Sequence, residues 1–392
     1  MYLLTDGLVV TEQEILKNHE VLIDGDRIKG IYPAGTIDPL KVTHTISANG
    51  GYIAPGFIDI HSDFIENMAS PRPTSVIDFN ISIRETEKIL VNQGITTIFH
   101  SLSFYKEDVF GAKPIREHQN VVKLIDVIAD THNRMHLIRH RFHARFEIDN
   151  ILGVDNLKSY INCGKVQLVS FMDHSPGQGQ YRNLEIFKHT LKGYRDLSDT
   201  QIDNIIQENM QSEKITVAGI SEISKLAQEK GIVIASHDDD SAEKIELVQQ
   251  FGAIISEFPI TLEVAHAARA KGMYTVAGAP NVLLGGSHSG NLCATTAIKA
   301  GAISILCSDY YPAALLHAIF KLHKQHGQDL CEMFRLVSYN PAKALKLDNE
   351  IGSLAVGKKA DILIINHTED NMPIITNVLV DGKLVSQVNY RI

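Results

Sequence analysis

The chain has 392 residues, and its 37 lysines and arginines against 46 aspartates and glutamates give a formal net charge of −9 at pH 7. This acidic balance, without a long basic stretch, argues against a nucleic-acid-binding protein, because binding to phosphate backbones requires clustered cations. A hydrophobic content of 44% is ordinary for a folded globular protein. The length suits one large domain with a small one, and such a core needs neither a disulfide nor a metal to fold.

The cysteines and the first residues indicate the compartment. Cys163, Cys293, Cys307 and Cys331 are scattered and never form a C-x-x-C pair, which favours a reducing environment and argues against a disulfide framework or a zinc ribbon. The first residues lack a basic segment followed by an apolar one, and no run of about 18 apolar residues occurs. We therefore expect a cytoplasmic protein without a signal peptide and without contact with a membrane.

Both ends of the chain resemble short β-strands joined by turns. Near the N-terminus, Asp24-Gly25 indicates a tight turn between two strands. Near the C-terminus, the apolar run 362–365 predicts a strand and residues 378–383 predict a hairpin. Because neither end alone can build a two-sided β core, we expect residues 1–50 and 346–392 to form one composite β-sandwich domain.

Residues 51–345 alternate between short apolar runs and helix-like stretches. The runs lie at 52–60, 95–99, 136–147, 166–172, 231–236, 252–258, 273–277 and 302–307. Eight strand–helix units predict an α/β fold, a (β/α)8 TIM-like barrel. A doubly wound open sheet is the alternative, but no G-x-G-x-x-G follows the first strand. In a barrel, functional groups lie at the carboxyl ends of the strands.

Side chains of the kind that bind metals follow most of these strands. They are His61 and Asp63, His100, Glu147, Asp173 and His174, His237 to Asp240, Glu257, Asn281 and Asp309. His61 and Asp63 are two residues apart, so they share one face of a strand and can bind one ion. Alone, an H-x-D motif is more simply a strand-end histidine before an N-capping aspartate. The preceding P-G-F-I-D-I run at 55–60 favours the metal site.

The stretch from His140 to Glu147 alternates in polarity, which places His143, Arg145 and Glu147 on one face. Polar side chains that point into a barrel lumen are costly without partners. We therefore interpret Glu147 as a bridge between two cations and Arg145 as a donor to phosphate. The alternative is an outward-facing edge that carries surface charges. Lys165, a candidate carboxylated bridge, opens its strand and so lies at the wrong end of the barrel.

Two histidines and one aspartate extend the predicted metal site. Either His174 or His237 alone would more often be a satisfied loop residue, but both follow apolar strands and together suit the second metal. Asp309 ends the eighth strand, where its carboxylate can bind the first metal and accept a proton from the attacking water. Asp309 can also cap the following helix, and the two roles are compatible.

The glycine-rich stretches 278–281 and 285–291 follow the seventh strand. They lack the G-K-[ST] of a P-loop. Free backbone N–H groups that lead into a helix nevertheless suit phosphate oxygens. The alternative is a flexible lid without ligand contacts. Arg72, after the first strand, adds a guanidinium near the predicted mouth.

At this point the residues resemble a known group of proteins. The opening β material, P-G-F-I-D-I-H-S-D and the closing I-G-S-L-A-V-G-K-K-A-D-I-L resemble the amidohydrolase superfamily. More narrowly, the chain resembles the alpha-D-ribose 1-methylphosphonate 5-triphosphate diphosphatase family of phosphonate metabolism, in the carbon–phosphorus lyase pathway. The similar blocks are H-S-D at 61–63, P-R-P at 71–73, H-R-F-H-A-R-F-E at 140–147, M-D-H-S-P-G-Q at 172–178, A-S-H-D-D at 235–239, E-F-P at 257–259, G-A-P-N at 278–281, G-G-S-H-S-G-N at 285–291 and S-D-Y-Y-P-A at 308–313.

The resemblance implies a binuclear metal-dependent hydrolase that cleaves a 5-triphosphate between its α and β phosphates and releases pyrophosphate. The implied metal ligands are His61, Asp63, Glu147, His174, His237 and Asp309, and Asp309 is also the implied general base. Two divalent ions are expected, zinc first and manganese or iron as alternatives, because mixed histidine and carboxylate ligation suits all three. The substrate-binding residues expected are Arg72, His143, Arg145, Gln178, Asn281, Ser287 and His288.

Gly179 and Leu284 stand where members of this family tend to carry basic residues. Fewer cations would weaken a triphosphate clamp, so a relative acting on a less phosphorylated ester is one alternative. A metal-dependent amidohydrolase or deaminase acting on a C–N bond is another. A non-catalytic barrel is the third, and it would have lost ligands, whereas all six are present. The expected partners are a small phosphorylated substrate and further copies of the chain in a homo-oligomer.

Overall fold

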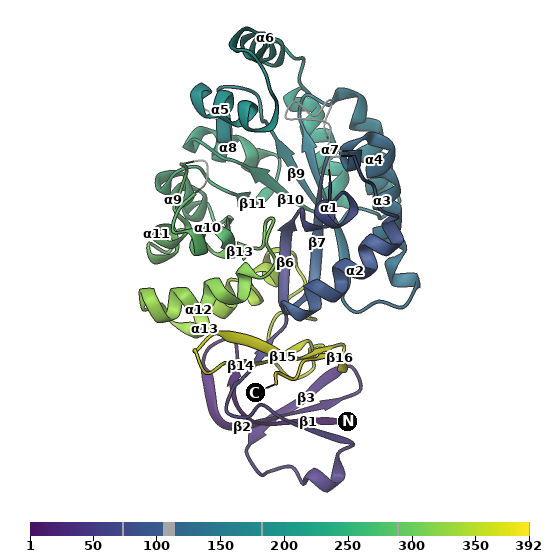
Figure 1. Ribbon diagram of the computed structural model, residues 1–392, viewed down its shortest axis with the longest axis vertical. Coiled ribbons are helices and arrows are strands. Elements are labelled where there is room, and N and C mark those ends of the chain that lie inside the picture. Colours follow the sequence, from purple (N-terminus) through teal and green to yellow (C-terminus); the bar gives the residue numbers. More distant parts are fainter. Residues whose placement is uncertain (73, 105–113, 182, 288–289, 392) are drawn as a thin grey trace.

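The computed structural model describes residues 1–72, 74–104, 114–181, 183–287 and 290–391. It shows a parallel barrel with a smaller β domain at one end, and both termini lie in the smaller domain (Figure 1). Among the described helices, none combines the length and the apolar character that a membrane span requires.

The barrel consists of eight strands that follow one another around the ring in chain order. They are β6 (Phe57–Ser62), β7 (Ile95–Phe104), β8 (Arg139–Glu147), β9 (Leu168–Met172), β10 (Val233–His237), β11 (Ala253–Glu257), β12 (Tyr274–Gly278) and β13 (Ile305–Cys307). Neighbouring strands are parallel, and a parallel bridge between Ser62 and Asp309 joins the last strand to the first. The predicted (β/α)8 barrel is confirmed.

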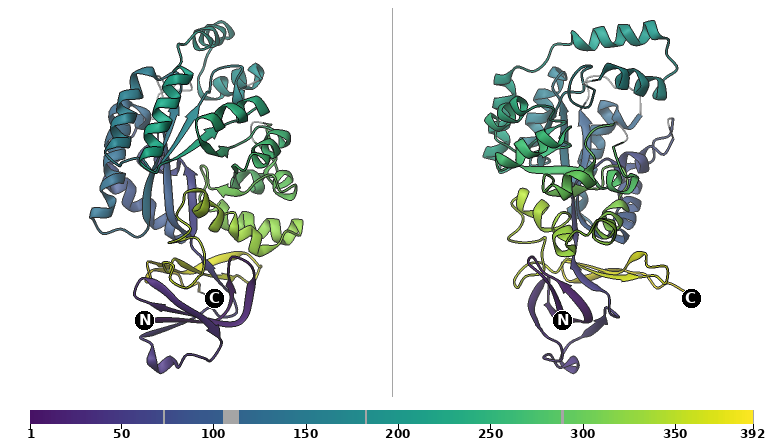
Figure 2. Two further views of the ribbon diagram at one scale, coloured as in Figure 1. Left: turned by 180° about the vertical axis from the view of Figure 1, so that it is seen from behind. Right: turned by 90° about the vertical axis from the view of Figure 1, so that its left-hand side faces the viewer.

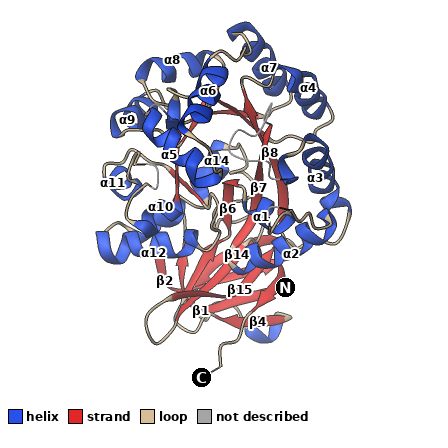
Figure 3. Ribbon diagram, turned by 45° about the horizontal axis from the view of Figure 1, so that its top comes forward, coloured by secondary structure: helices blue, strands red, loops and turns tan. Residues whose placement is uncertain are grey.

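Most helices surround the strands on the outside, whereas the short helix α14 lies across the barrel, where its Ala342 and Ala344 share an apolar cluster with Ile58 and Phe99 (Figure 3). In chain order, the helices are α1 (Phe64–Ala69), α2 (Phe79–Asn92), α3 (His118–Asp130), α4 (Val154–Asn162), α5 (Leu184–Tyr194), α6 (Asp199–Met210), α7 (Val217–Glu229), α8 (Ala242–Gln250), α9 (Leu262–Ala270), α10 (Ala279–Leu284), α11 (Ala294–Lys299), α12 (Ala314–His326), α13 (Leu330–Arg335) and α14 (Tyr339–Ala344). Helices α5 and α6 stand at the end opposite the small domain (Figures 1 and 2) and enclose a separate apolar cluster that includes Phe187, Leu191 and Ile202.

The polarity of β8 decides which of its side chains reach the lumen. Phe142, Ala144 and Phe146 are buried in the apolar layer that also contains Leu124 of α3 and Leu157 of α4. Since alternate residues of a strand point to opposite faces, His143, Arg145 and Glu147 face the inside of the barrel. The alternation predicted from the sequence is therefore confirmed, and the surface-edge alternative is wrong.

His100 lies on the outer side of the barrel, and its prediction as a strand-end functional group is wrong. Strand β7 continues to Phe104, so His100 is in the middle of the strand. Its Nε2 lies 2.9 Å from Nδ1 of His140, and Nε2 of His140 lies 3.3 Å from Glu87 Oε2. With Glu87 as the acceptor, each imidazole donates along this chain from Nε2. Burial lowers the pKa of both histidines, which are therefore neutral.

The small domain is one sheet of eight strands drawn from both ends of the chain. In sheet order its path is β16 (Lys383–Gln387), β15 (Pro373–Val380), β14 (Ile362–His367), β5 (Tyr52–Pro55), β1 (Tyr2–Val10), β2 (Ile15–Asp24) and β3 (Arg27–Pro33), and β4 (His44–Ser47) pairs with β1. The sheet encloses a core that includes Leu4, Val21 and Ile362. The composite β domain and both predicted hairpins are confirmed.

One predicted strand divides between the two sheets. The run 52–60 is two strands, because β5 pairs with β1 and β14 in the small domain, whereas β6 begins the barrel. The chain passes from one sheet to the other at Gly56, where a Cβ atom would lie 2.4 Å from the Thr96 side chain. With β5 included, we propose that the small domain comprises residues 1–55 and 346–392.

A buried ion cluster joins the small domain to the barrel. The Arg139 guanidinium, at the start of β8, donates to both carboxylate oxygens of Asp361, at 2.5 and 3.1 Å. It also donates to Asp381 in the turn between β15 and β16, at 2.5 Å. The side chains of Arg139 and Asp361 are only 10% and 4% exposed. The cluster therefore ties the amino end of a barrel strand to two segments of the small domain.

We expect Asp361→Asn to lower the free energy of unfolding by about 3–5 kcal/mol, because it leaves the buried Arg139 charge without its two-point partner. The matched control is Asp24→Asn, which removes an exposed pair with Lys29 whose side chains are 51% and 55% exposed. That change should cost about 1 kcal/mol or less. Urea unfolding of both variants measures the difference, and equal losses would contradict the structural role of Arg139.

The buried histidine pair predicts a dependence of stability on pH. Because the pKa of His100 lies well below the usual histidine value of 6.5, the unfolded chain takes up a proton below that pH that the folded chain cannot. The contribution of His100 to the free energy of unfolding is therefore fully present above this pH and is lost as the pH falls below it. In His100→Gln the drop in Tm between about pH 7.5 and about pH 5.5 should be smaller than in the unchanged chain. Replacement of the exposed His266 by Gln should leave the drop unchanged.

Candidate metal centre

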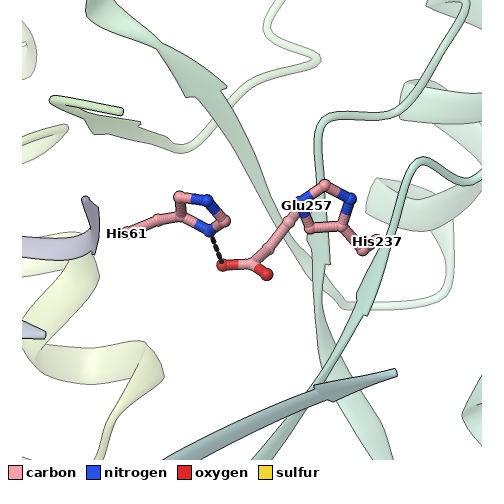
Figure 4. A group of neighbouring side chains, drawn as sticks. All are labelled: His61, His237 and Glu257. Atoms are coloured by element: carbon pink, nitrogen blue, oxygen red, sulfur yellow. Dashed lines mark hydrogen bonds and ion pairs between the residues drawn. The ribbon is translucent and has the colours of Figure 1, made fainter. Parts of the chain in front are cut away.

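Three strand-end side chains converge at the carboxyl end of the barrel. His61 of β6, His237 of β10 and Glu257 of β11 each offer a ligand atom, and these atoms lie within 4.8 Å of one another (Figure 4). Nδ1 of His61 lies 3.0 Å from Glu257 Oε1, and both side chains are buried. Glu257 was noted as a strand-end residue in the sequence but was not in the predicted ligand set.

A second group shares His237 with the first. It contains His174, His237 and Asp238, whose ligand atoms also lie within 4.8 Å of one another. Asp238 Oδ2 lies 3.0 Å from His237 Nδ1 and 3.5 Å from His174 Nε2. On its other side, Nδ1 of His174 contacts Glu147 Oε1. The structure thus brings together four of the six predicted ligands, His61, Glu147, His174 and His237, and adds Glu257 and Asp238.

Several polar atoms of the centre are buried without a hydrogen bond in the described part of the chain. They include both ring nitrogens of His237, Asp238 Oδ2 and Glu257 Oε2. The short distance between His237 and Asp238 does not have hydrogen-bond geometry, so we regard it as an electrostatic contact. Buried polar atoms are normally satisfied, and a cation held among imidazole nitrogens and carboxylate oxygens would satisfy these.

The protonation states suit this purpose. Burial, helped by the charge of Arg145, lowers the pKa of His61 well below its usual value, so its ring is neutral. Burial acts to raise the pKa of Asp238, but His237 and the contact with His174 hold that pKa well below its usual range. A neutral imidazole and an ionised carboxylate are the forms that bind divalent cations.

Asp309 lies beside this centre, where β13 meets β6. Its N–H donates to the carbonyl oxygen of His61 at 3.0 Å, and its own carbonyl oxygen accepts from the N–H of Asp63 at 3.0 Å. Burial raises the pKa of Asp309 to about 6, against the opposing charge of Arg145. A Cβ atom on Gly278 would lie 3.3 Å from Asp309 Oδ2, so the glycine leaves room for this carboxyl group.

Three strand ends share an unusual backbone turn. Asp238, Phe258 and Asp309 have positive φ values of 51°, 54° and 57°. Each N–H still donates to the neighbouring strand: Asp238 to Glu257, Phe258 to Val276 and Asp309 to His61, at 2.8, 3.0 and 3.0 Å. The turns therefore change the direction of the side chains without breaking the barrel hydrogen bonds.

His143 lies behind the centre. It is fully buried, and its ring nitrogens lie 3.0 Å from Ser101 Oγ and 2.9 Å from Ser170 Oγ. Burial lowers its pKa to about 3. Its Nε2 is also 3.6 Å from Glu257 Oε2. These contacts suit a His143 that supports Glu257. The sequence instead predicts that His143 contacts the substrate.

The other predicted residues differ in their burial and in their distance from the two ligand groups. Arg145 faces the lumen and influences the pKa of both His61 and Asp309, so its charge acts directly on the centre. Asp63 forms the N-cap position of α1 beside Asp309, outside both ligand groups. Arg72 and Gln178 are exposed.

In the glycine-rich region, the structure describes two of the three predicted substrate-binding residues. The Asn281 amide donates to the carbonyl oxygen of Leu292 and accepts from the N–H of Ala294, both at 2.9 Å. These two hydrogen bonds connect α10 to the start of α11. Ser287 is partly buried after α10. His288 lies outside the described residues.

The two departures from the family pattern differ in their surroundings. Gly179 has a φ of 48°, and a Cβ atom there would lie 3.1 Å from the Asp238 Cβ. A larger residue at this position would press on the second ligand group. Leu284 is 67% exposed, so the second position presents an apolar side chain to the solvent.

Two supporting residues were not among the predicted site residues. Asp59 Oδ1 accepts from the N–H groups of Ser308 and His61, at 3.1 and 3.4 Å, and burial raises the pKa of Asp59 to about 7. Lys244 Nζ donates to the carbonyl oxygens of His237 and Asp238, at 2.9 and 3.1 Å. Both hold backbone at ligand positions, and only the P-G-F-I-D-I-H block pointed to the first.

Comparison with known proteins agrees with this architecture. The chain matches the Amidohydrolase family over residues 183–385 and the NagA composite domain over residues 1–43. It is 33% identical over 349 residues to alpha-D-ribose 1-methylphosphonate 5-triphosphate diphosphatase of Escherichia coli (strain K12), which covers 88% of this chain and 91% of that protein. It is 24% identical to guanine deaminase of Mus musculus over 40% of this chain and 41% of that protein.

Solved structures show the same fold at low identity. N-acetylglucosamine-6-phosphate deacetylase from Pasteurella multocida aligns with a TM-score of 0.62 and 15% identity, over 98% of this chain and 99% of that chain. Dihydropyrimidinase from Brevibacillus agri NCHU1002 aligns with a TM-score of 0.65 and 15% identity, over 98% and 95%. The chain belongs to the amidohydrolase family, in the same group as the alpha-D-ribose 1-methylphosphonate 5-triphosphate diphosphatase, and it is a metal-dependent hydrolase.

Proposed function

We propose that this hydrolase cleaves the α–β phosphoanhydride bond of alpha-D-ribose 1-methylphosphonate 5-triphosphate and releases pyrophosphate. The observation that carries the proposal is the 33% identity to the Escherichia coli enzyme of that name over 88% of this chain. The strand-end side chains support it, because they offer two groups of metal ligands at one end of the barrel.

We further propose that the centre holds two divalent ions, zinc first and manganese or iron as alternatives. His61, His237 and Glu257 would hold one, and His174, His237 and Asp238 the other. Glu147, in contact with His174, and Asp309 and Asp63, beside His61, complete the predicted ligand set. When bound, such ions lower the pKa of a water molecule and offset charge on phosphoryl oxygens.

Asp309 is the proposed general base. Its carboxyl group is buried beside the ligands, and its backbone is held on both sides by β6. A carboxyl group with a pKa raised to about 6 is closer to neutrality than an exposed one, so it accepts and returns a proton more readily. Asp309 would take the proton of the attacking water.

Arg145 is the cation best placed for the phosphates. It points into the lumen, and its charge reaches both Asp309 and His61. A guanidinium offers a planar pair of donors that matches two phosphate oxygens. The proposal adds Arg72, Gln178, Asn281 and the loop with Ser287 and His288 as further contacts, with His143 behind them.

The setting of the enzyme is also proposed. The scattered cysteines favour the cytoplasm, and the expected ligand is a small phosphorylated molecule. A homo-oligomer is part of the same proposal.

The activity test is pyrophosphate release from alpha-D-ribose 1-methylphosphonate 5-triphosphate by the zinc- or manganese-loaded protein. We expect Asp309→Asn to lower kcat by about 100- to 10,000-fold, because the variant cannot accept the proton. Asp203→Asn, on the exposed side of α6, should keep full activity. Release of inorganic phosphate in place of pyrophosphate would contradict cleavage between the α and β phosphates. Cleavage of amides or aminopurines would favour the C–N alternative.

Metal binding is tested apart from activity. His237→Ala should weaken zinc binding by more than about 100-fold, because loss of supporting residues alone costs about 10- to 100-fold. His266→Ala, at an exposed position of α9, should bind zinc like the unchanged chain. Isothermal titration and metal analysis after chelator treatment measure both. If His237→Ala retains its zinc, the proposed centre is wrong.

A further inference from the structure

Phe258, directly after Glu257, has a backbone conformation that is rare for its type. Its φ is 54°, in the left-handed region. Most other non-glycine residues with positive φ here are Asp or Asn, whose short polar side chains tolerate that region. Among the described residues, Phe258 is the one aromatic residue in this state. Such an outlier persists only where the surroundings impose it, and outliers concentrate at functional sites.

The surrounding barrel imposes this conformation. The N–H of Phe258 donates to the carbonyl oxygen of Val276 in β12 at 3.0 Å. On the other side, the carbonyl oxygen of Glu257 accepts from Asp238 at 2.8 Å, and the N–H of Ile260 donates to Asp239 at 2.9 Å. The chain is thus held to both neighbouring strands across the turn.

The turn places Phe258 on the inner side of the barrel. In a regular strand, residues 257 and 258 would point to opposite faces, so Phe258 would point outward. Its ring instead lies 4.9 Å from the His61 ring, at an interplanar angle of 88°. It also lies 5.2 Å from the His237 ring, at 58°. Phe258 is therefore on the same side as Glu257 and packs against both histidines of the first ligand group.

This packing meets a specific need of His237. The torsion that orients an imidazole ring has a broad energy profile, so something else must set the ring plane. A metal-binding histidine usually donates its second ring N–H to a carboxylate or carbonyl oxygen, which fixes the ring. Neither ring nitrogen of His237 makes a hydrogen bond in the described part of the chain. Its Nδ1 lies 3.0 Å from Asp238 Oδ2 without hydrogen-bond geometry, so aromatic packing is the contact that we expect to set the plane of the ring.

We propose that Phe258 is a positioning residue that orients the rings of His61 and His237 for cation binding, and that its left-handed backbone serves to bring the ring there. The proposal rests on the metal centre proposed above. It predicts the effect of replacing Phe258 by a residue that suits the left-handed backbone but has no ring. Such a variant should keep or raise its metal-free Tm and should bind zinc more weakly.

Three variants of the full-length protein test this. Phe258→Asn suits the left-handed backbone but lacks the ring, so its metal-free Tm should equal or exceed that of the unchanged chain. Its zinc affinity, measured by competition with a chromophoric chelator, should fall about 10- to 100-fold. Phe258→Tyr keeps the ring and should keep the affinity. Phe258→Leu keeps apolar bulk without a flat face and should lose affinity like the asparagine variant. The absorption spectrum of the Co²⁺-loaded forms reports the ligand geometry.

The outcomes separate the two proposals. Unchanged zinc affinity in Phe258→Asn, with His237→Ala impaired, overturns the role of Phe258 alone. Unchanged affinity in His237→Ala overturns the metal centre itself. A joint fall of Tm and affinity in Phe258→Asn indicates a merely structural residue and also overturns the inference. If Phe258→Asn does not fold, the pair Phe258→Leu and Phe258→Tyr decides, and equal affinities of that pair refute the role of the ring.

Discussion

Closure of the barrel between its last strand and its first is the contact on which the site depends. Strand β13 has only three residues, and it meets β6 through the bridge between Ser62 and Asp309. Ser62 Oγ donates to the Asp309 carbonyl oxygen at 2.9 Å, and Asp59 accepts from Ser308. Because these residues adjoin His61 and carry Asp309 itself, the hydrogen bonds that close the ring also place the proposed general base beside the proposed metal ligands.

The centre is formed at a cost to the fold. It gathers buried imidazoles, buried carboxylates and left-handed backbone at three strand ends. A buried polar atom without a partner costs about 1–3 kcal/mol, so this end of the barrel is not optimised for stability. The ion cluster of Arg139 and the separate core of the small domain lie at the opposite end and contribute stability there. The protein thus separates this stabilising region from the end of the barrel that carries the proposed metal centre.

Local patterns were sufficient to predict much of the architecture. Each of the eight apolar runs overlaps one barrel strand, with different ends, and the polarity of residues 140–147 predicts which side of β8 faces the lumen. These features are local, because a strand alternates with a period of two and a parallel strand needs a long crossover. The strand-end positions then located His61, His174, His237 and Asp309 from the sequence alone.

Only the tertiary structure decided which side chains meet. His100 was expected at a strand end but lies in the middle of β7, because that strand is longer than its apolar run, and its side chain faces the outer helices. Glu257 and Asp238 join the ligand groups, and Phe258 reaches the lumen, through register across strands and positive φ values. The sequence by itself determined the strands, the alternation of polarity along them and most of the proposed ligands. The pairing of ligands depended on contacts between residues distant in the chain, which no local pattern encodes.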